Sequence, residues 1–155
     1  MVRTRLCTII CAYFQPELTA EDIIEELDEA MSKTSRSDQI LLAGDLNCRI
    51  DIPSKKTNLV IEYLEEEGFH MINTSSENTY VGPNGTSTID LVFINDGIKE
   101  ISQSVLSNIT VRKHLPVETI LETKKLHRNT TVQRRLQLTR NLEISKLQET
   151  DVQNI

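Results

Sequence analysis

Residues 39–47 have the sequence QILLAGDLN, which changes from apolar to polar side chains at Gly44. A short run of Ile, Leu and Ala predicts a buried β-strand, and a glycine allows the backbone to leave that strand without a Cβ clash. Asp45 and Asn47 are two residues apart, so an extended backbone presents both side chains on one side. Because reactive groups gather at the carboxyl ends of strands in open α/β sheets, this strand end is the first candidate site.

A carboxylate beside a carboxamide suits the chemistry of phosphate esters. Asp45 can position or deprotonate a water molecule or bind Mg²⁺ through oxygen, and Asn47 can donate a hydrogen bond to a phosphate oxygen. The same two residue types also form the Asx turn that commonly closes a strand. Residues 44–47 alone therefore leave both interpretations open.

Helices and strands are expected on both sides of this stretch. The apolar run 6–14 predicts an earlier strand, and Thr19 with Asp22 marks the start of a helix with an apolar face through Ile23 and Leu27. The order β-α-β-α followed by successive strands predicts an α/β fold whose later part is mostly antiparallel. The later elements are expected as a helix from Thr57 to Gly68, strands at 69–72, 79–81, 88–94, 104–111 and 115–121, turns at 83–85 and 95–97, and a weak helix from Leu136 to Leu147.

Three further polar side chains stand out: Tyr13 at the end of an expected strand, Asp90 where the strand expected at 88–94 becomes apolar, and His114 directly before a strand. Asp90 shares its face with apolar neighbours and needs a partner or a task, and Ser87 is one residue that could bond it. Histidine is the natural proton donor near neutral pH, and the tyrosine phenol can hydrogen-bond a phosphate. Each also has a structural interpretation, as a strand-edge carboxylate, an exposed histidine and a tyrosine at the rim of the core.

The chain has 155 residues, of which 38% are hydrophobic and 26% charged, enough to bury the core of one domain. Its net charge of −6 argues against a simple electrostatic nucleic-acid binder. Residues 1–121 hold 10 basic and 19 acidic side chains, whereas residues 122–155 hold 7 and 4. This shift predicts a domain over 1–121 and a polar, basic tail or linker over 122–155.

The number of cysteines and the length of the apolar runs indicate the cellular compartment in which we expect the protein. Cys7, Cys11 and Cys48 are an odd number, and no secretory signal pattern opens the chain, so we expect reduced thiols in an intracellular protein. The longest apolar runs fall far short of the ~20 residues of a membrane span. We therefore expect no membrane partner, and no motif points to a small-molecule cofactor.

Taken in order, these motifs resemble the endonuclease/exonuclease/phosphatase superfamily. The series comprises a strand ending in Tyr-x-x-Pro at Tyr13, Gly-Asp-x-Asn at residues 44–47, Ser-x-Ile-Asp ending at Asp90, and His-x-Pro at His114. Residues 77–95, ENTYVGPNGTSTIDLVFIN, look most like the endonuclease domains of non-LTR retrotransposons. The resemblance covers about residues 6–121 and implies the C-terminal half of a DNase I-like, four-layer α/β sandwich.

The resemblance also implies an activity, the Mg²⁺-dependent hydrolysis of DNA phosphodiester bonds. By position in the motifs, Asp45 and Asn47 act at the attacking water, the phosphate and the metal. Tyr13 contacts the scissile phosphate, Asp90 supports the site, and His114 stabilises the charge of the pentacovalent phosphorus. Water attacks in line while the metal and the hydrogen-bond donors neutralise the developing charge.

The chain departs from the family pattern in two places. The family has an Asp immediately before the His, where this chain has Lys113. We expect an imidazole without a carboxylate partner, next to an ammonium group, to be a poor cationic stabiliser with a poorly fixed tautomer. The family also has an N-terminal half with an Asn and the main metal-binding Glu. Both precede the Tyr13 strand and are expected to be missing here.

Two hypotheses about function follow. The chain is either an endonuclease domain fragment with residual or complemented activity, or an inactive, truncated remnant of a retroelement. A phosphatase acting on inositol or lipid phosphates has no support from residues 1–121. If one sheet is missing, the apolar face of the other would be exposed, and a partner or self-association would cover it.

Overall fold

The structure is a computed structural model that describes residues 1–35, 38–74, 76–109, 112–124 and 131–138. Within these residues, the centre is a five-stranded sheet with the strand order β1-β2-β3-β7-β4. Strands β2 and β3 run parallel, and the other neighbours are antiparallel. The strands of this sheet are β1 (Val2–Arg3), β2 (Thr8–Tyr13), β3 (Ile40–Asp45), β4 (Phe69–Met71) and β7 (Asp90–Asn95).

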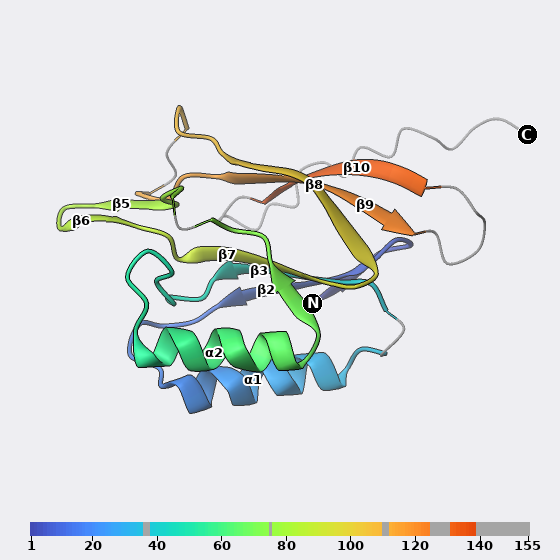
Figure 1. Cartoon of the computed structure of the whole chain (residues 1–155), viewed down its shortest axis with the longest axis horizontal. Coiled ribbons are helices and arrows are strands. Elements are labelled where there is room, and N and C mark those ends of the chain that lie inside the picture. The colour runs from blue at the N-terminus through green and yellow to red at the C-terminus, as the bar shows by residue number, and fades with distance from the viewer. Residues whose placement is uncertain (36–37, 75, 110–111, 125–130, 139–155) are drawn as a thin grey trace, which may run out of the picture.

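Two helices cover one face of this sheet (Figure 1). Helix α1 (Ala20–Ser32) begins at Thr19 with the predicted capping box, in which the Thr19 hydroxyl accepts from the Asp22 N–H and the Asp22 carboxylate accepts from the Thr19 N–H. Helix α2 (Lys55–Glu66) begins earlier than predicted, because Ser54 rather than Thr57 is its N-cap residue. The Ser54 hydroxyl accepts from the Thr57 N–H, which satisfies one of the N–H groups left over at a helix start.

The helix-covered face carries the larger core. Side chains of alternate strand residues, among them Leu42 and Phe93, pack against Ile23 and Leu27 of α1 and Val60 of α2. Phe93 is fully buried. The amphipathic pattern of the two helices explains this packing, because their apolar residues face the sheet and their acidic residues remain on the solvent side.

The opposite face of the central sheet is also covered within the chain. A second sheet in the described part of the chain has the order β10-β9-β8, with β8 (Ile98–Val105), β9 (Val117–Lys124) and β10 (Thr131–Leu138). Figure 1 shows this sheet on the side away from the helices. Its buried residues pack with Leu41, Ala43, Val92 and Ile94 of the central sheet. The expectation of an exposed apolar face is therefore wrong for these four residues, because strands β8 and β9 bury them.

The strand predictions after residue 72 need two corrections. The hairpin joins β5 (Tyr80–Gly82) to β6 (Gly85–Ser87), whereas the strand predicted as its second arm, 88–94, corresponds to β7 of the central sheet. Between them, the Thr88 and Ile89 N–H groups donate to the side chains of Asp51 and Thr79, which takes these residues out of a strand ladder.

The second correction concerns β8, which ends at Val105, whereas a strand was predicted at 104–111. Residues 99–101 of β8 are exposed, so this strand lacks the apolar alternation from which a strand is predicted. The other predicted strands lie within about two residues of observed ones, and Asn95-Asp96-Gly97 forms the predicted turn between β7 and β8.

The predicted domain boundary after Leu121 falls inside strand β9, which continues to Lys124. Most of the weak helix predicted from Leu136 to Leu147 lies outside the described residues, and Leu136 itself is in strand β10. In the described part of the chain, neither helix is long and apolar enough to cross a membrane.

Candidate active site

Three of the predicted site residues form one row across the central sheet. Tyr13 at the end of β2 is the register partner of Asp45 at the end of β3, and Asp45 is in turn the partner of Asp90 at the start of β7. Because side chains alternate along a strand, this row continues the face that Ala43 and Val92 occupy. The site is therefore on the face of the sheet opposite the helices, where the apolar residues end.

Gly44 permits the close approach of β2 and β3 beside this row. A Cβ atom at Gly44 would lie 1.8 Å from the carbonyl oxygen of Ala12 on the neighbouring strand, and the residue has φ of +154°. Real side chains do not tolerate such a contact, so only glycine fits without movement of the backbone. Its role is thus to place Asp45 against β2. The expected exit of the backbone at Gly44 is wrong, because β3 remains paired with both neighbouring strands through Asp45.

Asn47 is fixed by the turn that follows β3. Its backbone is left-handed with φ of 48°, which asparagine tolerates better than most residues. The side-chain amide donates to the Phe14 carbonyl oxygen at 2.6 Å, and the backbone N–H donates to Asp45 Oδ1 at 3.1 Å. The Asx turn predicted as the plain alternative is therefore present, and it also orients both polar side chains.

His114 has a carboxylate partner, contrary to the expectation drawn from Lys113. Its Nδ1 lies 2.8 Å from Oδ2 and 3.0 Å from Oδ1 of Asp90. Both side chains are largely buried, so the Nδ1–H donates to Asp90 and the tautomer is fixed. The prediction failed because it considered only the neighbouring residue in sequence, whereas the carboxylate comes from strand β7.

The backbone on both sides of His114 is bound to hairpin strand β5. The Leu115 N–H donates to the Thr79 carbonyl at 2.7 Å, and the Val81 N–H donates to the Lys113 carbonyl at 2.7 Å. The ring of Tyr80 contacts the ring of His114 edge-on, with 4.9 Å between centroids. Lys113 has φ of 74°, a left-handed conformation that is uncommon for lysine. The hairpin and the histidine are thus a single structural unit.

Two buried residues that were not predicted hold Asp90 in place. The Thr79 hydroxyl accepts from the Asp90 N–H at 3.0 Å, and the Asn73 side chain donates to the Asp90 carbonyl at 3.1 Å. The predicted bond from Ser87 to Asp90 is not among the hydrogen bonds of the described residues. Residues 73–79 are all polar in the sequence, so no pattern singled out Asn73 and Thr79 or indicated which residue they support.

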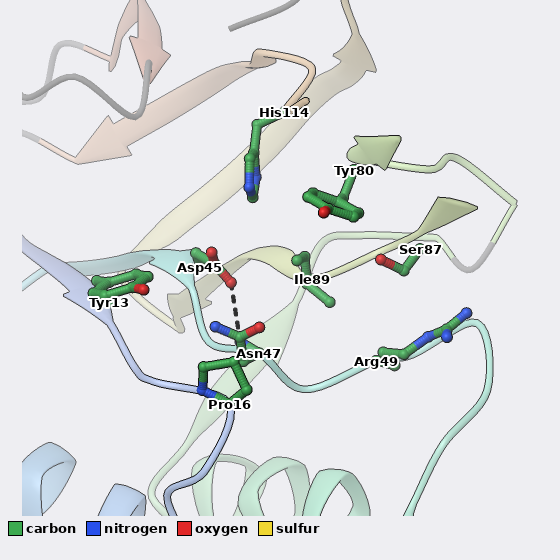
Figure 2. A pocket seen from close by; sticks show the side chains of 9 residues that line it. All are labelled: Tyr13, Pro16, Asp45, Asn47, Arg49, Tyr80, Ser87, Ile89 and His114. Carbon is green, nitrogen blue, oxygen red and sulfur yellow. Dashed lines mark hydrogen bonds between the residues drawn. The ribbon is translucent and has the colours of Figure 1, made fainter. Parts of the chain in front are cut away.

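A pocket of about 460 Å³ opens at the row. Figure 2 shows Tyr13 on one side and Arg49 on the other, with Asp45, Asn47 and Ile89 between them. Four of the five predicted site residues line it, and the fifth, Asp90, lies in contact with His114. The other lining residues were not predicted as site residues: Pro16, Tyr80, Ser87 and Ile89 belong to the quoted motifs, and Arg49 lies outside them.

Asp45, Asp90 and His114 also form a cluster that could hold a divalent metal ion. Each offers one ligand atom, and these atoms lie within 4.8 Å of one another. Mg²⁺ and Ca²⁺ prefer oxygen ligands. The carboxylates of Asp45 and Asp90 fit that preference, although the hydrogen bond to His114 already engages the second one.

The chain is similar to known proteins in both sequence and fold. Residues 7–118 match the family model described as endonuclease-reverse transcriptase. The chain belongs to the endonuclease-reverse transcriptase family. The match contains all five predicted site residues, most of the central sheet and strand β8. The superfamily resemblance drawn from the motifs is thus confirmed, and the family is that of a nuclease-type domain.

Solved structures show the same fold. The endonuclease domain of TRAS1, a telomere-specific non-LTR retrotransposon, is 20% identical and superimposes with a TM-score of 0.62 over 73% of this chain and 55% of its own. An endonuclease/exonuclease/phosphatase family protein from Leptotrichia buccalis is 18% identical, with a TM-score of 0.56 over 72% of this chain and 47% of its own. The chain thus spans about half the length of these relatives. No curated protein matches the chain significantly.

Proposed function

We propose that this chain supplies part of the active site of a Mg²⁺-dependent endonuclease that hydrolyses DNA phosphodiester bonds. The observation that supports the proposal is the row Tyr13, Asp45 and Asp90, completed by His114 on the same pocket. A phenol, two carboxylates and an imidazole at one edge of the sheet can supply the base and the hydrogen-bond donors that promote in-line attack of water on a phosphate.

Each of these residues has a role in the proposed reaction. Asp45 accepts the proton of the attacking water as the new bond to phosphorus forms. His114, whose Nδ1–H is held by Asp90, donates from Nε2 to a phosphate oxygen when the ring is protonated, and so stabilises the charge of the transition state. Tyr13 donates to the scissile phosphate through its hydroxyl.

A bound Mg²⁺ would neutralise charge on the phosphate and the leaving oxygen. The side-chain oxygens of Asp45 and Asn47 would hold it, with Asp90 as a further carboxylate within the same cluster. Asn47 keeps its amide nitrogen on the Phe14 carbonyl, an arrangement that leaves its side-chain oxygen as the metal ligand.

The second candidate is an inactive remnant of such an endonuclease. It is suggested by Lys113, which precedes His114 where the family pattern has an Asp. The fixed His114–Asp90 pair favours the active alternative, because it removes the defect expected from Lys113.

Nicking of supercoiled plasmid DNA distinguishes the two candidates. With Mg²⁺ present, the wild-type chain should nick, and Asp45→Asn should lower the rate about 10²- to 10⁴-fold without lowering the thermal unfolding temperature. Asp96→Asn is the matched control, since Asp96 is an exposed aspartate beyond the opposite end of β7, and it should leave nicking unchanged. Equal activity of wild type and Asp45→Asn would favour the inactive remnant.

A further inference from the structure

Arg49 is the one arginine or lysine among the residues that line the pocket in the described part of the chain. It follows Asn47 by two residues in the loop between β3 and α2. A substrate that carries a negative charge on every unit meets mostly neutral or acidic side chains elsewhere in this pocket. The position of this single cation therefore matters for how such a substrate lies.

The backbone of Arg49 is anchored from both sides. Cys48 and Ile50 are buried core residues, with exposed fractions of 0% and 7%. The Ile50 N–H donates to the Thr88 carbonyl at 3.2 Å, which joins the loop to the segment between β6 and β7. Arg49 is thus an exposed residue on a backbone that has little freedom to move.

The guanidinium is held by three hydrogen bonds to the protein. Nε and Nη2 bind the two carboxylate oxygens of Asp51, and Nη2 also donates to the Thr86 carbonyl at 3.1 Å. Asp51 in turn accepts from the Thr88 N–H at 3.1 Å. The two N–H groups on Nη1 have no partner among the described residues, so this edge of the guanidinium remains available to a ligand.

Arg49 and Asp51 belong to the same loop, so their ion pair could form without Arg49 lining the pocket. Its consequence is preorganisation, because an arginine fixed in one geometry loses less entropy when it binds an oxyanion. Figure 2 places Arg49 on the far side of Ile89 from Tyr13, with the carboxylate of Asp45 between them. A nucleic-acid strand that runs from Tyr13 past Asp45 would therefore reach Arg49.

We propose that Arg49 binds, through Nη1, a backbone phosphate of the same DNA strand next to the phosphate that is cleaved. The inference rests on the proposed function and adds to it the direction in which the strand leaves the pocket. Phosphate contacts of this kind position the substrate and carry no sequence information. Arg49 is therefore a substrate-binding residue, and Asp51 is a positioning residue that acts through it.

The salt dependence of DNA binding tests this assignment. Each phosphate contact that a protein makes adds about 0.9 to the slope of log K against log salt concentration on duplex DNA. We would measure the binding of the full chain to a fluorescent DNA duplex by anisotropy, in EDTA, over a series of salt concentrations. Arg49→Ala should lower the slope by about 0.9, and Arg49→Lys should retain it.

Two further variants serve as controls. Arg5→Ala removes a cation that precedes β2, whereas the pocket is beyond the other end of that strand, so the slope should not change. Asp51→Asn breaks the ion pair but keeps the arginine, and it should weaken binding while leaving the slope within about 0.3 of the wild-type value.

The outcomes distinguish a failure of this inference from a failure of the proposed function. If the wild-type chain binds and Arg49→Ala keeps the wild-type slope, Arg49 only ties the loop together and the inference is wrong while the proposed function stands. If the wild-type chain neither binds nor nicks DNA, the proposed function and this inference both fall.

Discussion

The two faces of the central sheet are formed by the same strands, but they differ in how far their apolar side chains extend. On the helix side, the alternate residues Leu42 and Phe93 are buried along the strands. On the other side, Leu41 and Ala43 are equally buried, but the next residue on that face is Asp45. The helices therefore cover a continuous apolar face, whereas the second sheet covers an apolar face that ends in the polar row.

One strand can therefore contribute apolar side chains to the core and a polar side chain to the site. Side chains alternate between the faces with a period of two, so a single polar residue at a strand end changes one face and leaves the other apolar. Tyr13, Asp45 and Asp90 each do so on neighbouring strands that are in register. The site is built by ending one apolar face early, and the helix-covered core continues beneath it.

The largest expected effect comes from a pair of neighbouring leucines that tests the two faces directly. Leu42→Ala opens a cavity in the larger core and should lower the free energy of unfolding by about 4 kcal/mol, whereas Leu41→Ala should cost about 2 to 3 kcal/mol. Urea unfolding of both variants measures the two values. If Leu41→Ala proves neutral, β8 and β9 do not cover this face in solution.

A smaller effect is expected where the two faces meet the site, at Gly44. Gly44→Ala places a Cβ against the Ala12 carbonyl and should cost about 3 kcal/mol, because strands β2 and β3 must separate. Gly85→Ala is the matched control, since Gly85 also has positive φ but no atom within 4 Å of an added Cβ. It should cost only about 1 to 2 kcal/mol, for the backbone conformation alone. Equal losses of stability would show that contact with β2 is not what requires glycine.

The smallest effect concerns the loop beside the site. The hydrogen bond from Arg49 holds the pKa of Asp51 below its ordinary value of 3.8. A carboxyl group with a lowered folded pKa stabilises the protein above its unfolded pKa, and that stability is lost as the pH falls through the folded value. Asp51→Asn should therefore cost under about 1 kcal/mol at pH 7 and have less effect below pH 4. Urea unfolding at pH 7 and pH 3 would contradict this if the difference grew in acid.

Most of the central sheet could be predicted because its signals are local. The strands around residues 8–13 and 40–45 are continuous apolar runs, and the Thr19–Asp22 capping box is visible within four residues. Strand β8 could not be placed, because most of its residues are exposed and its pairing with β9 is not encoded in any periodicity. The separation of the hairpin from β7 was also hidden, since it depends on side chains of other segments, Thr79 and Asp51, which accept hydrogen bonds from the backbone between β6 and β7.

The individual residues of the candidate site could be predicted from motifs, but the hydrogen bonds that join them could not. Motifs identified Tyr13, Asp45, Asn47, Asp90 and His114, which do lie together. The bond between Asp90 and His114 joins residues 24 positions apart, and reasoning from Lys113 alone gave the wrong expectation. Arg49 carried no signal at all, because an arginine in a loop is ordinary until the structure places it at the pocket.

The attachment of His114 to hairpin strand β5 has a consequence for protein engineering. The hydrogen bonds of Val81 and Leu115 and the contact of Tyr80 with the imidazole mean that the hairpin and residues 112–115 move together. A loop exchange that replaces β5 and β6 from another protein would also displace the histidine. A successful graft must therefore carry both segments, as two separate inserts taken from one donor.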